Sequence, residues 1–137
     1  MKTKIQDFAD ILALAVCADG EYAEAEQIVL GEIADAFEIE EATLVDAVEK
    51  SIAKIENLDE EQIGDLAVSA GEGILEEEVG EVFEAVLQIV LSDGILCREE
   101  AEVLLDIAEA IGIEAADALM LTADMVKDEG EHIDVII

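Results

Sequence analysis

The sequence contains no proline and no tryptophan, and only 3% of its residues are aromatic. Proline breaks helices and is confined to edges in sheets, so its absence leaves long helical segments uninterrupted. The residues that dominate instead are alanine, leucine, isoleucine, valine and glutamate, and this mixture favours helices joined by short turns. We therefore predict an all-α fold of about seven helices.

Basic residues are scarce, since six lysines and arginines stand against 37 aspartates and glutamates, giving a net charge of −31. This charge argues against direct binding to nucleic acid or to an anionic membrane, because both are themselves negative. Cations or basic proteins are the expected partners. With 53% hydrophobic residues and a mean hydropathy of +0.39, the chain is too apolar to be disordered by its charge.

Residues that carry common chemistry are also few. Cys17 and Cys97 form no C-x-x-C pair and predict neither a disulfide framework nor a zinc site, and His132 is the only histidine. We find no Ser/His/Asp set and no glycine-rich phosphate loop. The sequence therefore predicts a protein without enzymatic activity.

No apolar run reaches the roughly 18 to 20 residues of a membrane-spanning helix, so we expect no direct membrane insertion. The first residues lack the apolar core of a secretory signal, which favours a cytoplasmic location. The length of 137 residues fits one domain over 1–137.

An internal repeat is the strongest signal in the sequence. Asp19-Gly20 is followed 74 residues later by Asp93-Gly94, and residues 19–42 share many identities with 93–116. Matched apolar positions in the two copies follow i, i+3, i+4, i+7 spacing, which predicts one buried helix face in each. These positions are Leu30, Ile33, Ala34 and Phe37 in the first copy and Leu104, Ile107, Ala108 and Ile111 in the second. We predict two three-helix repeats, at about 4–57 and 75–127, that pack around a pseudo-twofold axis.

Local signals place several helix boundaries. Thr3 with Gln6 and Asp59 with Gln62 resemble capping boxes, so a helix is expected to begin at each. The glycines at 71 and 73 should end the helix that begins near Asp59. The last helix, from Glu114 to about Lys127, is expected to turn its apolar residues inward, and the tail at 130–137 is expected to pack against the body in a conformation that the sequence leaves open. The inward residues of that helix would be Leu119, Met120, Ala123 and Val126.

The repeated Asp-Gly turns carry the candidate metal ligands. Asp19, Gly20 and Glu26 stand at the spacing of positions 5, 6 and 12 of an EF-hand loop, and Asp93, Gly94 and Glu100 repeat this spacing. The first and third loop positions carry no side-chain oxygen, so neither turn is an EF-hand. Two roles stay open: the carboxylates converge on a cation, or each Glu caps the start of the following helix while each Asp bonds amides of the turn.

The segments "ALAVCADGEYAEAEQIVLGEIADAFEI" and "IVLSDGILCREEAEVLLDIAEAIGI" resemble the TerB-like domain of tellurite-resistance proteins, which is related to the amino-terminal region of DjlA-type co-chaperones. The resemblance implies a single helical domain without catalytic activity, a role in bacterial stress or tellurite resistance, and membrane-linked partners. It also implies that Asp19, Glu26, Asp93 and Glu100 bind a divalent cation, for which we expect calcium or magnesium. The sequence departs from the family pattern at Ala23 and Cys97, where a hydroxyl or acidic cap is usual.

Two functional hypotheses follow. In the first, the protein is a stress module that responds to divalent cations through the two Asp-Gly turns. In the second, it is an acidic adaptor that recruits a basic partner through its carboxylate surface. Glu77, Glu81 and Glu84 form one acidic stripe that is either a solvated helix face or part of such a docking surface. The sequence does not predict the oligomeric state.

Overall fold

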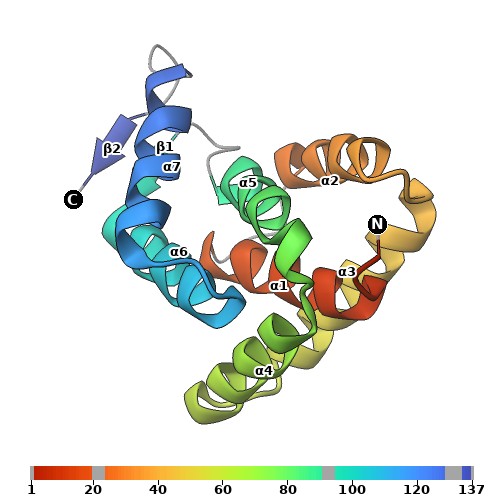
Figure 1. The fold of residues 1–137 in the computed structure, drawn as a ribbon. Coiled ribbons are helices and arrows are strands. Elements are labelled where there is room, and N and C mark those ends of the chain that lie inside the picture. Colours follow the sequence, from red (N-terminus) through yellow and green to blue (C-terminus); the bar gives the residue numbers. More distant parts are fainter. Residues whose placement is uncertain (1, 20–23, 91–94, 129–133, 137) are drawn as a thin grey trace.

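The computed structural model describes residues 2–19, 24–90, 95–128 and 134–136, and side chains beside the gaps are outside the description. The fold is all-α, as predicted (Figure 1). The described residues form seven α-helices, one short 3-10 helix and two three-residue strands. In chain order these are α1 (Ile5–Asp19), α2 (Glu24–Ala36), α3 (Glu41–Ile55), α4 (Glu60–Gly73), η1 (Glu76–Glu78), α5 (Val79–Val90), β1 (Ile95–Cys97), α6 (Arg98–Ile111), α7 (Ala115–Asp128) and β2 (Asp134–Ile136).

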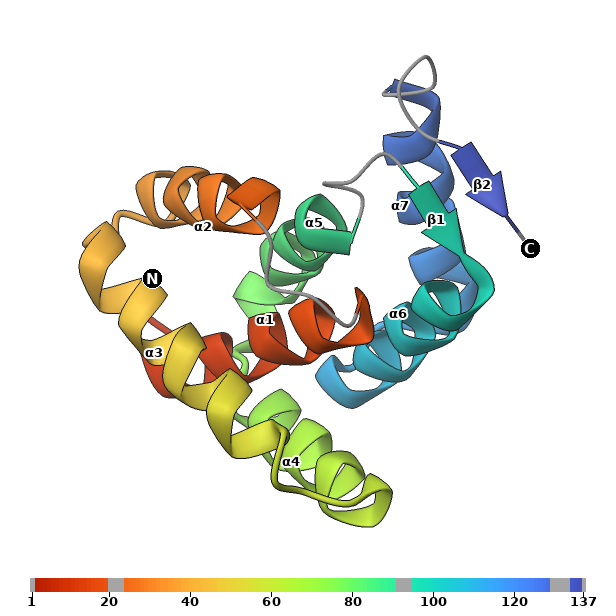
Figure 2. The same ribbon diagram turned by 180° about the vertical axis from the view of Figure 1, so that it is seen from behind.

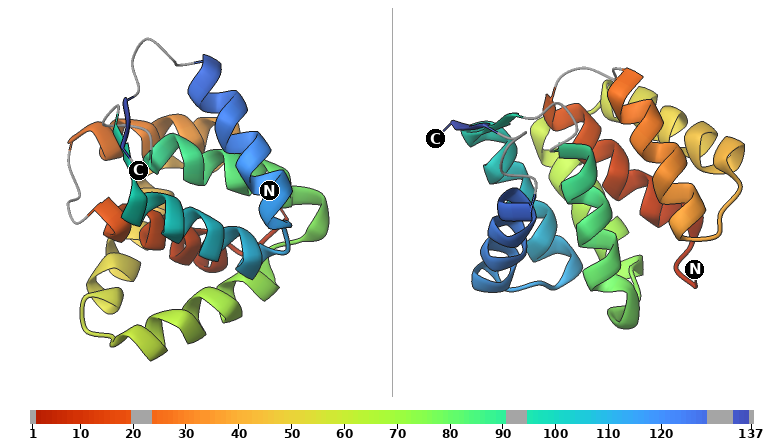
Figure 3. Two further views of the ribbon diagram at one scale, coloured as in Figure 1. Left: turned by 90° about the vertical axis from the view of Figure 1, so that its left-hand side faces the viewer. Right: turned by 90° about the horizontal axis from the view of Figure 1, so that it is seen from above.

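Helix α1 forms the centre of the molecule. It packs against α3, α4, α5 and α6, with α2 and α3 on one side of the α1–α5 pair and α6 and α7 on the other (Figures 1 and 3). All nine residues from Phe8 to Val16 are buried, and this run is apolar at every position except Asp10. A helix that is apolar all round belongs inside a protein. Phe8 also packs on Phe37, with ring centroids 4.8 Å apart.

The tail returns to the body through a strand pair. Residues 134–136 form β2, which lies parallel to β1 with Leu96 opposite Val135 (Figure 2). The sequence did not predict this pairing, because three-residue strands are too short to show an alternating pattern.

Equivalent turns join α2 to α3 and α6 to α7. The amide of Ile39 donates to the carbonyl of Ala34 at 2.8 Å, and the amide of Ile113 donates to that of Ala108 at the same distance. The residue before each isoleucine has a left-handed backbone, with φ of 57° at Glu38 and 94° at Gly112. This is the hydrogen-bond pattern of a Schellman helix end. The sequences of the two turns match at the 74-residue offset, although one has glutamate where the other has glycine.

Three of the four predicted apolar positions are buried in both copies, whereas at the fourth position Ile111 is buried and Phe37 is half-buried. Leu30, Ile33 and Ala34 are at most 1% exposed, and Leu104, Ile107 and Ala108 at most 2%. The helices around them differ, because α1 packs closely along α3 whereas α5 touches α7 only slightly. The repeat of the complete three-helix unit stays a prediction.

The predicted inward face of α7 is wrong. Leu119 and Met120 are 58% and 64% exposed, and Ala123 is exposed as well, whereas Ala118 is buried. The side chain of Val126 lies outside the described residues. The periodicity of the helix correctly located an apolar stripe, but a different face of α7 contacts the body.

Of the two predicted capping boxes, one is confirmed. The carboxylate of Asp59 accepts from the amide of Gln62 at 2.8 Å, and the Gln62 side chain accepts from the Asp59 amide at 3.1 Å. The box of Thr3 and Gln6 is wrong, because the Thr3 hydroxyl bonds to Glu78 and the Gln6 amide group to Asp10. Glu78 lies 75 residues from Thr3 and is within its reach only in the folded chain, whereas Asp10 is one helical turn from Gln6.

Candidate functional site

Of the four predicted metal ligands, the structure describes the backbone of three and the side chain of none. Asp19 is the last residue of α1, and Glu26 and Glu100 are each the third residue of their helices, α2 and α6. Their side chains, and all of Asp93, lie outside the described residues. The third helical position is where a capping glutamate stands. The structure therefore leaves both roles of these residues open.

Elsewhere, within the part of the chain that the structure describes, no three carboxylate, thiol or imidazole groups gather as metal ligands would. Cys17 is a free, half-buried thiol. Burial and the nearby Glu56 carboxylate raise its pKa, so the thiol stays protonated at neutral pH and is a poor nucleophile.

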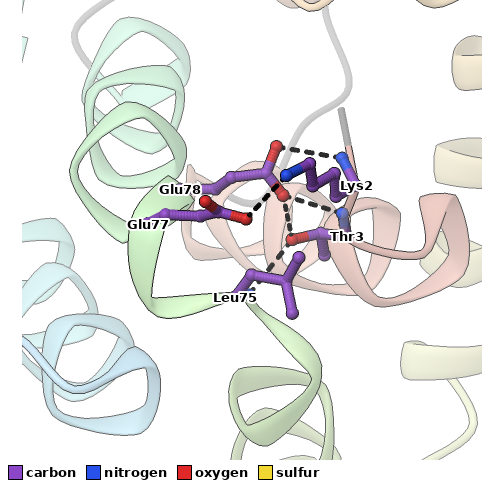
Figure 4. Close-up of polar contacts among 5 residues, drawn as sticks. All are labelled: Lys2, Thr3, Leu75, Glu77 and Glu78. Atoms are coloured by element: carbon purple, nitrogen blue, oxygen red, sulfur yellow. Dashed lines mark hydrogen bonds and ion pairs between the residues drawn. The ribbon is translucent and has the colours of Figure 1, made fainter.

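Glu78 ties the start of the chain to the α4–α5 connection (Figure 4). Its carboxylate accepts from the amides of Lys2 and Thr3 at 3.0 and 2.7 Å and from the Thr3 hydroxyl at 2.6 Å. The same hydroxyl accepts from the amide of Leu75 at 3.1 Å. The Thr3 hydroxyl bond, followed by the two amide bonds, lowers the pKa of Glu78 against the opposing effect of burial. This cluster anchors the start of the chain through a buried carboxylate that accepts three hydrogen bonds.

Asp10 is the polar centre of the α1–α3 contact. Its Oδ1 accepts from the Ser51 hydroxyl at 2.7 Å, from the Gln6 amide group at 3.0 Å and from the Lys54 ammonium at 3.4 Å. The carboxylate is almost completely buried, while half of the Lys54 side chain is exposed. The buried charge is thus paired and hydrogen-bonded, and it links α1 to α3. Its signal in the sequence is a single aspartate inside an otherwise apolar run.

A hollow of about 460 Å³ lies between α4 and α6. Its lining includes three exposed carboxylates, Glu72, Asp106 and Glu109. The other lining residues are small or apolar: Gly64, Ala67, Val68 and Ala110. Small side chains explain the hollow, since they leave space between the helices where leucine would fill it.

Gly71 sets the distance between the same two helices. A Cβ atom at this position would overlap the carbonyl oxygen of Ala110, so only glycine allows the α4 and α6 backbones to approach this closely. The predicted end of α4 at the glycines 71 and 73 is confirmed, because the helix ends at Gly73 and the following amide, of Ile74, donates to the carbonyl of Gly71.

Asp106 and Glu109 also line a second hollow, of about 400 Å³, at the α6–α7 turn. Leu105 and Ile113 supply apolar surface there, and Glu114 adds a third carboxylate. The outer edge of α6 thus presents two carboxylates between two partly apolar depressions. We call this surface, formed by both hollows, the α6 acidic ridge.

Among the described side chains, no lysine or arginine forms an ion pair with a carboxylate of the α6 acidic ridge. The ion pairs of the described side chains involve Lys2, Lys50 and Lys54, which bind Glu77, Asp46 and Asp10. The predicted stripe of Glu77, Glu81 and Glu84 is exposed, and the last two line a smaller hollow of about 220 Å³ between α2 and α5.

None of the helices in the described residues is long and apolar enough to cross a membrane. Comparisons of the chain with family models, with curated proteins and with solved structures find no match. The TerB-like resemblance therefore stays a prediction that rests on the repeated sequence pattern.

Proposed function

We propose that this protein is a non-enzymatic acidic adaptor, which binds a basic segment of another protein at the α6 acidic ridge. The observation that carries the proposal is the hollow between α4 and α6, which is lined both by small and apolar residues and by the carboxylates of Glu72, Asp106 and Glu109. A lysine or arginine matches this arrangement, because its methylene stem can lie on apolar surface while its charged end meets carboxylates.

The charges of the ridge support both the affinity and the choice of partner. Opposite charges about 4 Å apart attract by about 1 kcal/mol in water and about 4 kcal/mol at a protein surface of lower effective dielectric constant. Across the whole molecule, the net charge of −31 also draws basic partners and repels acidic ones. Specificity for one partner would come from the two depressions on either side of Asp106 and Glu109.

The test is calorimetric titration of the full chain with a short peptide of alternating lysine and alanine residues. We expect the Asp106→Asn, Glu109→Gln variant to bind several-fold more weakly than wild type, with the loss shrinking as salt screens the charges. The matched control is Glu32→Gln, Glu49→Gln, which removes the same charge from exposed positions on α2 and α3. Equal weakening by both double variants would show diffuse charge attraction and would refute a site on the ridge.

Divalent-cation binding is a second candidate, in line with the TerB-like resemblance and a role in bacterial stress or tellurite resistance. The feature behind it is the repeated sequence spacing, in which Asp19 and Glu26 recur as Asp93 and Glu100 after 74 residues. Calcium or magnesium is titrated at constant ionic strength while the melting temperature is followed. A site at a hundred times its dissociation constant stabilises the fold by about 2.7 kcal/mol. A response that survives intact in the Glu26→Gln, Glu100→Gln variant would exclude these ligands.

A further inference from the structure

The solvent-facing side of α7 carries an apolar stripe. Ala116, Leu119, Met120 and Ala123 follow i, i+3, i+4, i+7 spacing, and all four are exposed. The two large side chains are 58% and 64% exposed, whereas Ala118, on the face toward the body, is 1% exposed. Single exposed apolar residues are ordinary on a protein surface, but a row at this spacing is the pattern by which one helix packs against another.

We propose that this α7 stripe binds an amphipathic helix of a partner protein, with lysines or arginines beside the apolar seam of that helix. The inference rests on the proposed function, because it names a second contact for the same class of basic partner. The two large residues suit this role, since leucine supplies apolar area and methionine adapts its shape to different partners.

Charge selects the occupant. Glu114 and Asp117 are exposed at the start of α7, and the described residues offer no base that pairs with either. Two copies of this chain would each bring a charge of −31 to the contact, and such repulsion keeps proteins apart. A helix with basic flanks meets the stripe and its acidic neighbours with opposite charge. The tail residues 134–136 already pair with β1.

The probe is a peptide of leucine and lysine whose leucines recur at i, i+3, i+4 and i+7, compared with a scrambled peptide of the same composition. We expect the full chain to bind the patterned peptide more tightly in calorimetric titrations. The Leu119→Gln, Met120→Gln variant should lose about tenfold in affinity for it, because the large apolar anchors of an interface carry most of its energy. The control is Ile28→Gln, which removes an equally exposed apolar side chain from α2 and should leave affinity unchanged.

The possible results separate this inference from the proposed function. Equal binding of both peptides by wild type and variant overturns the α7 stripe and leaves the acidic adaptor standing. Failure to bind either peptide overturns both. Circular dichroism checks that the variant folds. We expect it to fold because both substituted positions are exposed. Sedimentation that shows a wild-type dimer, lost in the variant, identifies a second copy as the occupant and overturns the inference. Binding of phosphatidylcholine vesicles that depends on Leu119 and Met120 also overturns it.

Discussion

Replacing Glu38 by glycine should stabilise the protein. Glu38 ends the turn between α2 and α3 with φ of 57°, and it is the one described residue other than glycine with a positive φ. Its counterpart Gly112 adopts φ of 94° in a turn with the same hydrogen bonds. A side chain with a Cβ atom strains this conformation, and glycine does not.

The expected gain is the difference between two effects. Relief of the left-handed conformation is worth about 1–2 kcal/mol, and the extra freedom of glycine in the unfolded chain takes back about 0.5–1 kcal/mol. Loss of a negative charge beside the carbonyl end of α2 adds about 0.3–1 kcal/mol. We expect a net gain of about 1 kcal/mol, or an increase of about 2–4 °C in the melting temperature.

The Glu38→Gln variant isolates the conformational part, because it removes the charge and keeps the Cβ atom. Glu38→Asn should fall between glutamine and glycine, since asparagine tolerates the left-handed region. In the matching turn, Gly112→Ala should destabilise the protein by about 1 kcal/mol or more. The measurement is urea unfolding at fixed pH and salt. If glycine at 38 is no more stabilising than glutamine, the strain argument is refuted.

Three further predictions concern packing and buried polar groups. Gly71→Ala should lower the free energy of unfolding in urea by about 1–3 kcal/mol, because its methyl group would overlap Ala110. The control Gly80→Ala, where the added methyl group meets open space, should be neutral or stabilising. Equal effects of the two substitutions would contradict the close approach of α4 and α6. Glu78→Gln should cost about 1–2 kcal/mol at neutral pH. Because folding lowers the pKa of Glu78, its contribution to the free energy of unfolding is present above the ordinary glutamate pKa and is lost as pH falls through the folded pKa. The stability advantage of wild type over this variant should therefore vanish in acid. An advantage that does not change with pH would refute this. Asp10→Ala should cost about 2–3 kcal/mol, and a double-mutant cycle with Ser51→Ala should show coupling, whereas additive losses would mean that their 2.7 Å bond contributes nothing.

The sequence was informative where one local pattern determines the outcome. Apolar spacing correctly located the buried residues of α2 and α6, such as Leu30 and Leu104, because only one face of each helix carries enough apolar side chains to pack against the body. The Asp59 cap was predictable because its partner, Gln62, is only three residues away. Thr3 was not, because a residue 75 positions later competes for its hydroxyl. Glu38 carries no sign of its left-handed backbone, since glycine is the usual signal and is absent there.

Surfaces were the least predictable part of the molecule. Periodicity shows that α7 has an apolar stripe, but a sequence pattern cannot say whether another element of the same chain covers that stripe. The hollow between α4 and α6 depends on small residues such as Gly64 and Ala110, which carry no signal of their own. Its carboxylates were indistinguishable among 37 acidic residues until folding placed Asp106 and Glu109 beside apolar surface.

The excess of negative charge and the exposed stripe on α7 explain one another under the proposed function. An apolar helix face open to solvent promotes self-association in a protein of low net charge. A charge of −31 opposes contact between copies, so Leu119 and Met120 can stay uncovered without driving aggregation. The same charge attracts a basic helix, and docking of that helix would both cover the stripe and neutralise its acidic surroundings. Raising the salt concentration should therefore weaken binding of the basic partner and increase the association of free copies with one another. These opposite responses distinguish a protein that binds a basic partner from one whose acidic surface only keeps its copies apart.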